Sequence, residues 1–217
     1  MVRRALLICG ILSSLLYVAM TVAVPMRWPD YRSASQTISE LSAIGAPTRT
    51  LWIVPAAIYT LLVTAFGFGV WTSAAGNRRL RVAGMSIVAY GSLGLLWPLA
   101  PMHLREALAA GGSTLSDTLH IALAVATVLL MLLAIAFAAA AFGARFRSYS
   151  VVSVVLLAAF GGLTFRDAPG VAANLPTPWI GVWERINVAL FLVWVVVLAF
   201  ALLRSRTAAA RRVPLAA

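Results

Sequence analysis

The sequence is poor in charge, in cysteine and in lysine. Only 11% of its 217 residues are charged, whereas soluble domains carry about 25%. The single cysteine, Cys9, excludes a disulfide framework within the chain. The hydrophobic share is 62%, which is more apolar surface than a soluble core buries. Together these features exclude an ordinary soluble domain and indicate an integral membrane protein.

The positive charge is carried by arginine alone, because lysine is absent. A formal net charge of +11 would suggest a nucleic-acid partner in a soluble protein. Here, however, most of the arginines stand at the termini and in short segments between apolar runs. We therefore interpret the charge as a signal of membrane topology and of contact with anionic lipid, and we expect no nucleic-acid partner.

Six apolar segments come close to the roughly 20 residues that a helix needs to cross a bilayer. They cover about residues 5–24, 51–74, 82–100, 115–143, 149–165 and 180–203. The first follows two arginines as a signal peptide would, but it exceeds the roughly 7–15 apolar residues of a signal sequence, and no small-residue cleavage site precedes Pro25. We expect an all-α domain of six uncleaved transmembrane helices in residues 1–203, followed by a disordered basic tail in residues 204–217.

An even number of spans places both termini on one side of the membrane. That side would carry no acid and eleven arginines: Arg3, Arg4, Arg78, Arg79, Arg81, Arg145, Arg147, Arg204, Arg206, Arg211 and Arg212. The other side would carry six arginines and all six acids, so the whole net charge lies on the side of the termini. The positive-inside rule then predicts that both termini are cytoplasmic.

Residues 25–49 form the longest segment without lipid-like character, and they would lie on the outer side. Thr37 and Glu40 have the spacing of a capping box, in which each side chain bonds the backbone N–H of the other residue. Gly45 suits the left-handed position after a helix end, and Pro47 prevents continuation. We expect an interfacial helix of two turns, about 12 Å long, between these signals. Glu40 then either only caps this helix or also faces a ligand.

Asp117 and His120 are spaced so that a helix presents both on one face. A carboxylate in this position fixes the tautomer of the histidine and raises its basicity. The pair is therefore either a structural hydrogen bond near a helix start or a general base. We predict no metal, because no HExxH or paired-histidine motif occurs. A weaker alternative is zinc held by His103, His120 and Asp117, with Glu40 or Glu184 beside them.

Glu184 and Arg185 open the sixth apolar segment at its outer end. Adjacent helix residues do not face each other, so each should meet a partner from another segment. The expected partners are Arg49 or Arg166 for the glutamate, and Glu40 or Asp117 for the arginine. Such contacts would either hold the outer helix ends together or leave an arginine to bind an anionic head group.

The middle of the spans carries hydroxyl and amide groups but no charge. Ion pumps and proton-coupled transporters normally place ionisable residues there, so the sequence disfavours both classes. The glycines of the second and third spans are most simply interpreted as positions where two helices pack closely: Gly67, Gly69, Gly91 and Gly94.

Three short motifs stand out along the chain. They are Ile38-Ser39-Glu40-Leu41 with Gly45-Ala46-Pro47, the histidine His120 early in the fourth span, and Trp183-Glu184-Arg185-Ile186 at the start of the sixth. In these motifs, and over about residues 5–203, the sequence resembles the prokaryotic six-helix membrane proteins catalogued as domain of unknown function 998. The resemblance implies a six-helix bundle in the plasma membrane of a prokaryote. It implies no activity and no catalytic residue.

Three hypotheses of function remain open from the sequence. The leading one is a polar pocket on the outer face that binds or processes a lipid-like amphiphile without a cofactor. An enzyme of this kind would use His120, oriented by Asp117, as base and Glu40 or Glu184 as acid. Its head-group ligands would be Arg185, Arg49 and Arg166. The alternatives are a small-solute transporter and a structural or assembly partner whose outer charges form an ion-pair clasp.

Overall fold

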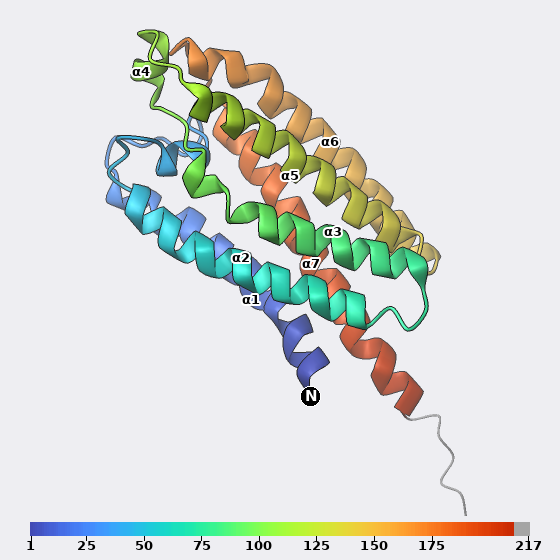
Figure 1. Ribbon diagram of the computed structural model, residues 1–217. Coiled ribbons are helices and arrows are strands. Elements are labelled where there is room, and N and C mark those ends of the chain that lie inside the picture. Colours follow the sequence, from blue (N-terminus) through green and yellow to red (C-terminus); the bar gives the residue numbers. More distant parts are fainter. Residues whose placement is uncertain (211–217) are drawn as a thin grey trace, which may run out of the picture.

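The computed structural model describes residues 1–210, which fold into helices joined by loops, without a strand in that range (Figure 1). The long helices are α1 (Val2–Ala23), α2 (Arg49–Thr72), α3 (Arg78–Gly94), α5 (Leu115–Ala139), α6 (Ala144–Ala172) and α7 (Ile180–Ala210). The short elements are helix α4 (Arg105–Ala109) and the 3-10 turns η1 (Pro25–Arg27), η2 (Ser39–Ser42) and η3 (Trp97–Leu99). Six helices are long and apolar enough to cross a membrane. The expected all-α fold with six long apolar helices that could span a membrane is therefore confirmed for the described residues.

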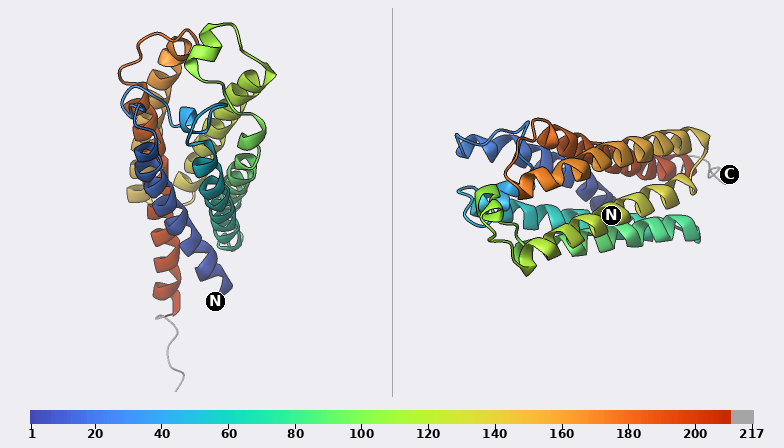
Figure 2. Two further views of the ribbon diagram at one scale, coloured as in Figure 1. Left: turned by 90° about the vertical axis from the view of Figure 1, so that its left-hand side faces the viewer. Right: turned by 90° about the horizontal axis from the view of Figure 1, so that it is seen from above.

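The six long helices form a ring in chain order. Each packs against the next one along the chain, and α7 packs back against α1. The start of α1 and the end of α7 lie at one end of the bundle, and the long loops with α4 lie at the other (Figures 1 and 2). We name this second end the cap; it consists of residues 24–48, 95–114 and 173–179.

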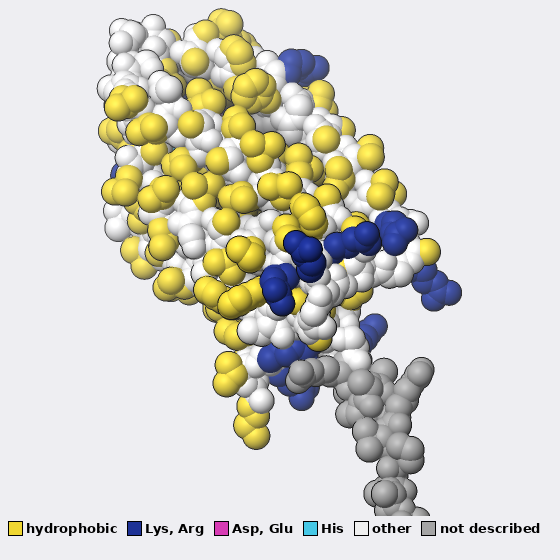
Figure 3. Space-filling view, turned by 45° about the vertical axis from the view of Figure 1, so that its right-hand side comes forward, with side chains coloured by type: hydrophobic (Ala, Val, Ile, Leu, Met, Phe, Trp, Pro, Cys, Tyr) yellow, Lys and Arg dark blue, Asp and Glu magenta, His cyan; other side chains and the backbone are white. Residues whose placement is uncertain are grey.

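Apolar side chains fill the ring between the helices. Phe66, Ile87, Ile135, Leu157 and Trp194 come from five different helices and are fully buried. Many large apolar side chains also point outward, as Figure 3 shows for one face. A hydrocarbon environment favours such a surface, whereas water would not. Buried and outward apolar residues together explain the high hydrophobic content.

Glycines allow α2 and α3 to approach each other closely. A Cβ atom on Gly67 would lie 2.6 Å from the backbone nitrogen of Val88, and one on Gly91 would lie 2.2 Å from the hydroxyl of Thr64. Such distances are shorter than any ordinary van der Waals contact. The expected role of these glycines in close helix packing is therefore confirmed for this helix pair.

The helix ends differ from the expected spans because hydrogen bonding in a helix does not stop where apolar residues stop. Helix α6 begins at Ala144 and continues through Pro169 to Ala172, well beyond the expected residues 149–165. Helix α7 continues to Ala210 through alanines and arginines, which are strong helix formers. The expected disordered tail is thus helical up to that residue, and the rest of it lies outside the described residues.

The first loop of the cap contains a 3-10 turn where we expected a two-turn helix. The capping-box bonds are present, since Glu40 accepts from the Thr37 N–H and donates its own N–H to the Thr37 hydroxyl. Gly45 has the expected left-handed backbone, with φ at +88°. The helix does not extend because the Ile44 N–H donates to the carbonyl of Met102, 2.8 Å away in the second loop of the cap.

Arginine side chains gather at the end of the bundle that holds the termini (Figure 3). They come from the start of α1, from the α2–α3 and α5–α6 connections and from α7: Arg3, Arg4, Arg78, Arg79, Arg81, Arg145, Arg147 and Arg204. Two of these arginines donate hydrogen bonds to neighbouring helices. Arg3 donates to Ser73 and to the Leu202 carbonyl, and Arg79 donates to the Ala140 carbonyl.

Candidate functional site

Glu40 lies at the centre of the cap, where its side chain is fully buried. Its Oε1 atom accepts a hydrogen bond from Arg105 Nε at 2.6 Å, and its Oε2 atom accepts one from Arg105 Nη2 at 3.0 Å. This two-pronged pairing offsets much of the free energy lost when the carboxylate leaves water. Arg105 was not among the residues that the sequence singled out.

The remaining capacity of the Glu40 carboxylate is used within its own loop. Its Oε2 atom also accepts from the backbone N–H of Thr37 at 2.6 Å and from the Thr37 hydroxyl at 3.0 Å. Its Oε1 atom accepts from Gln36 Nε2 at 3.2 Å. A carboxylate offers about four acceptor positions, and five donors surround this one. Glu40 therefore has no lone pair left for acid–base chemistry on a ligand.

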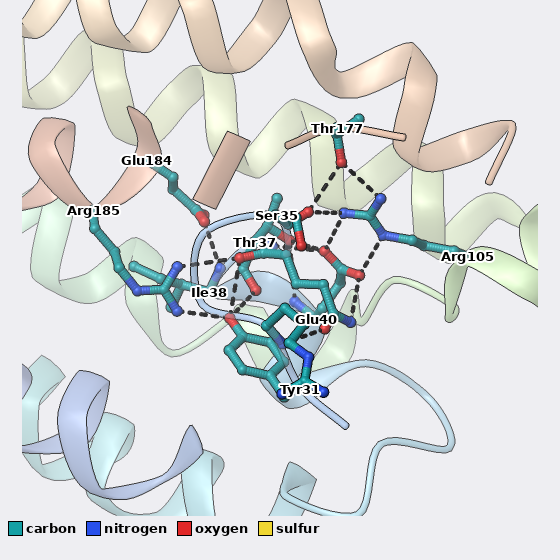
Figure 4. A network of polar contacts seen from close by, with 11 residues as sticks. Tyr31, Ser35, Thr37, Ile38, Glu40, Arg105, Thr177, Glu184 and Arg185 are labelled. Atoms are coloured by element: carbon teal, nitrogen blue, oxygen red, sulfur yellow. Dashed lines mark hydrogen bonds and ion pairs between the residues drawn. The ribbon is translucent and has the colours of Figure 1, made fainter. Parts of the chain in front are cut away.

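Arg105 joins all three loops of the cap (Figure 4). Besides Glu40, its Nη1 atom donates to the Thr177 hydroxyl at 2.7 Å, and its Nη2 atom donates to the Ser35 carbonyl at 2.7 Å. The Thr177 hydroxyl donates in turn to the Ser35 carbonyl at 3.0 Å. We name these four residues the clasp. The clasp fixes the first, second and third loops of the cap relative to one another.

Arg185 of α7 holds a different part of the first loop. Its Nη1 atom donates to the Ser33 carbonyl at 2.7 Å and to the Gln36 carbonyl at 3.1 Å, and its Nη2 atom donates to the Tyr31 hydroxyl at 2.7 Å. Burial raises the pKa of Tyr31, so its hydroxyl stays protonated. This hydroxyl donates to the Thr37 carbonyl at 2.7 Å. Arg185 therefore uses its hydrogen bonds to fix the backbone of the first loop.

The ion pairs that we expected for Glu184 and Arg185 are replaced by other contacts. Glu184 accepts from the backbone N–H of Ile38. Arg49 donates to the Ser42 carbonyl at 2.6 Å, and Arg166 pairs with its neighbour Asp167 at 2.9 Å. These predictions were wrong because Arg166 pairs with the adjacent Asp167, and because the other three side chains lie against the backbone of residues 31–42. Its carbonyl and N–H groups contact the side chains first.

Asp117 contacts His103, whereas the sequence predicted a contact with His120. Its carboxylate accepts from the His103 backbone N–H at 2.7 Å and lies 2.8 Å from the ring atom Nδ1. It also completes a capping box with Thr114 at the start of α5. The i, i+3 spacing missed this arrangement because the loop before α5 folds back over the helix start and brings His103 closer.

His120 is held by two other groups. Its Nδ1 atom lies 2.9 Å from the Ala100 carbonyl, and its ring packs edge-on against Trp97 with 4.8 Å between the ring centres. The side chain is buried. A histidine base oriented by Asp117 is therefore not present in this geometry.

The residues considered for zinc do not form one cluster. Within the described residues, no three side chains of histidine, cysteine, aspartate or glutamate come together as metal ligands would. His103 and His120 have different hydrogen-bond partners, and Glu40 is enclosed by donors. This geometry offers no ready set of three ligands, which a catalytic zinc requires.

Two hollows, both shallow and wide open to the surroundings, flank the segment of residues 33–36. The first, which we name the groove, has a volume of about 430 Å³ and lies between this segment and α7. Its lining residues are Ser33, Ala34, Val182, Arg185, Ile186 and Ala189, and the surface that it exposes is apolar. The Ala34 carbonyl accepts from the N–H groups of Gly181 and Val182, which fixes this wall to the start of α7.

The second hollow, which we name the cleft, has a volume of about 470 Å³. It lies between Ser35 and Gln36 on one side and residues 174–178 on the other, and Arg105 contributes to its lining. Its exposed surface is partly polar. The groove and the cleft thus share the segment of residues 33–36 as a wall, and the clasp and Arg185 hold that wall in place.

Several residues of this site carried no usable signal in the sequence. Arg105 stands in a loop beside Glu106, a setting typical of a solvated surface pair. Thr177 lies between two prolines and looks like an ordinary turn residue. The only available hint was that an acid at a predicted cap needs a cation if it becomes buried. That rule does not say which of the arginines pairs with the buried acid.

Comparison with known proteins gives a family and no activity. No curated protein and no solved structure matches the chain. The model of one family, described as "Protein of unknown function (DUF998)", matches residues 11–201. This range contains the clasp, both hollows, four of the six long helices entirely and the larger part of α1 and α7. The chain therefore belongs to the DUF998 family of proteins of unknown function.

Proposed function

We propose that this chain is a multi-pass protein of a prokaryotic plasma membrane with both termini in the cytoplasm and the cap outside. The asymmetry of charge supports this orientation, because arginines without acids gather at the end that holds the termini. Anionic lipid would be attracted to that end by about 1 kcal/mol for each arginine near the membrane surface. Membrane lipid is thus the partner that we propose, and nucleic acid is not.

The function that the geometry supports best is the binding of a lipid-like amphiphile beside the cap. The observation that carries this proposal is the groove, because it is apolar and lies where α7 leaves the cap. Trp179 is exposed next to it and packs near Trp183. Tryptophans gather at the level of lipid head groups. A hydrocarbon chain in the groove would gain about 25 cal/mol for each Å² of apolar surface buried.

In this account, the charged residues of the cap position the wall of the groove and do not react with the ligand. Glu40 and Arg105 fix the wall through Ser35, and Arg185 fixes it through Ser33. Glu184 holds Ile38 in the same loop. The enzyme hypothesis is weaker because Glu40, one of its two proposed acids, is enclosed by donors, and because the proposed base His120 bonds the Ala100 carbonyl while Asp117 contacts His103.

Filling the groove tests the proposal. Ala189 is an exposed small residue in the groove, so Ala189→Trp should occupy the space of a hydrocarbon chain without touching the clasp. Ala122→Trp is the matched control, because Ala122 is exposed on α5 far along the chain from the groove. We expect lipid that co-purifies stoichiometrically with the wild type and with the control, and at least a fivefold loss in Ala189→Trp at an unchanged melting temperature. Equal lipid content in all three proteins would refute the proposal.

A second candidate is a structural or assembly partner that presents the cap to another protein. The clasp supports it, because a surface held rigid before binding loses less conformational entropy on binding. Here Ala189→Trp would leave partner binding intact, whereas breaking the clasp would weaken it. A transporter has less support, since the buried polar groups of the bundle interior are hydroxyls and an amide such as Tyr59, Tyr90 and Asn187.

A further inference from the structure

The cleft and the groove lie on the two sides of residues 33–36, and a single ligand that occupied both would cross the exposed face of Ala34. We infer that the cleft holds the phosphate group of an outer-leaflet phospholipid whose acyl chain lies in the groove. This inference rests on the proposed function and adds the chemical class of the head group.

Both hollows lie beside the start of α7. The groove follows α7 from Val182 to Ala189, and the cleft lies just before the helix start at residues 174–178. At 1.5 Å per residue, the axial distance from the start of α7 to Ala189 is about 14 Å. The head group would then lie beside the cap and the chain would point along α7 into the bilayer.

The lining of the cleft offers hydrogen-bond donors and a cation but no acid. Arg105 Nη1 carries two hydrogens, and the structure assigns one of them, to the Thr177 hydroxyl. The side chains of Asn174 and Ser35 line the cleft without a hydrogen bond to another described residue. Glu40, which neutralises Arg105, is fully buried behind it and does not line the cleft. Uncommitted donors near an arginine favour an anionic acceptor such as phosphate.

The position of Asn174 is set by the local backbone. Its φ angle is +50°, in the left-handed region that asparagine adopts more readily than most residues. The next N–H, of Leu175, donates to the Gly170 carbonyl at 2.8 Å and closes the end of α6. The amide side chain of Asn174 is therefore carried on a defined turn at the edge of the cleft.

Asn174→Asp tests the head-group assignment with almost no change of shape. Aspartate tolerates the same backbone conformation, but it places a negative charge where phosphate would bind. In native mass spectrometry of the full chain, we expect phosphatidylglycerol to bind at least fivefold more weakly than to the wild type, from about 1 kcal/mol of repulsion at short range in water. Diacylglycerol, which has the chains without the phosphate, should bind equally to both proteins. Unchanged binding of phosphatidylglycerol would overturn the inference.

Ala189→Trp separates failure of this inference from failure of the proposed function. If this variant loses both lipids while Asn174→Asp loses neither, the groove binds a chain and the cleft does not bind phosphate. If Ala189→Trp loses neither lipid, the groove itself is not a binding site and both proposals fail. Inorganic phosphate alone should not bind measurably. Saturable binding of it to Ala189→Trp would overturn the assignment to a lipid.

Discussion

At the scale of single residues, the pairing of Glu40 with Arg105 dominates the cap. Taking a carboxylate fully out of water costs several kcal/mol, and only good geometry with further hydrogen bonds offsets that cost. Glu40 meets this requirement with five donors, two of them from Arg105. Loss of the charge on one partner would leave the other buried without compensation.

We therefore expect Glu40→Gln to destabilise the protein by about 3–5 kcal/mol. The new amide group would point hydrogens at donors such as the Thr37 N–H and would leave Arg105 unpaired. Asp167→Asn is the matched control, because it removes the same charge from a pair whose arginine is 67% exposed. That control should change the free energy of unfolding by less than about 1 kcal/mol. Thermal unfolding in detergent measures both, and equal effects would contradict the account.

A double-mutant cycle distinguishes the two possible partners of Asp117. Because Asp117 contacts His103, the two residues should show a coupling energy of about 0.5–3 kcal/mol in unfolding. Asp117 and His120 should couple by less than about 0.5 kcal/mol, since His120 bonds the Ala100 carbonyl. Substitutions to asparagine and glutamine keep the side-chain sizes similar. The account fails if the coupling to His120 is the larger one.

The sequence predicted contacts within the first loop and not those between loops. The reciprocal bonds of Thr37 and Glu40 follow from spacing alone, because a capping box is local. The pairing of Glu40 with Arg105 depends on how three loops fold over one another, and helix periodicity carries no information on that. The sequence did place Glu40, Glu184 and Arg185 on the same side of the membrane, and in the structure all three hold the first loop of the cap.

At the scale of elements, the close contact of α2 with α3 is the most sensitive to substitution. Gly67→Ala should destabilise the protein by about 1–3 kcal/mol, because the added methyl group would meet the backbone of Val88. Gly162→Ala is the matched control in α6, where an added Cβ meets nothing within 4 Å. It should stabilise by up to about 1 kcal/mol through higher helix propensity. Unfolding in detergent checks the pair, and effects of the same sign would count against the observed packing.

The existence of the six spans was predictable, because runs of about 20 apolar residues have few other uses. Their ends were not. The turn around Arg145 and Arg147 is already helical, since Gly143 is the N-cap of α6 and both arginines are exposed in its first turn. Pro169 marked a loop in the sequence, yet α6 passes through it. The length of an apolar run indicates how much of a helix can lie in lipid, whereas backbone hydrogen bonding decides at which residue the helix ends.

At the scale of the whole molecule, the proposed orientation in the membrane rests on the distribution of charge. We expect Ser113→Cys, in an exposed loop of the cap, to react with a membrane-impermeant maleimide in intact cells. Ala144→Cys, exposed at the start of α6, should react only after the cells are opened. Cys9→Ser provides a background without other thiols. The reverse pattern of labelling would place the cap in the cytoplasm and remove the basis for an outer-leaflet ligand.

The bundle, the clasp and the groove act together in the proposed function. The ring of helices provides one wall of the groove through α7, and the clasp holds the opposite wall, residues 33–36, at a fixed distance from it. Because both walls are fixed before binding, an amphiphile would lose little free energy to ordering of the protein. The central claim is therefore that this groove, among all lipid-facing surfaces, is selectively occupied.

Photocrosslinking with a phospholipid that carries a diazirine in its acyl chain tests this claim most directly. The full chain would be irradiated in bilayers and the crosslinked residues identified by mass spectrometry. We predict crosslinks concentrated at Ser33, Ala34 and residues 182–189, with loss of this cluster in Ala189→Trp. Crosslinks spread evenly over the outward faces of α5 and α6, and equally frequent in the variant, would show that the groove is ordinary lipid-facing surface and would contradict the account.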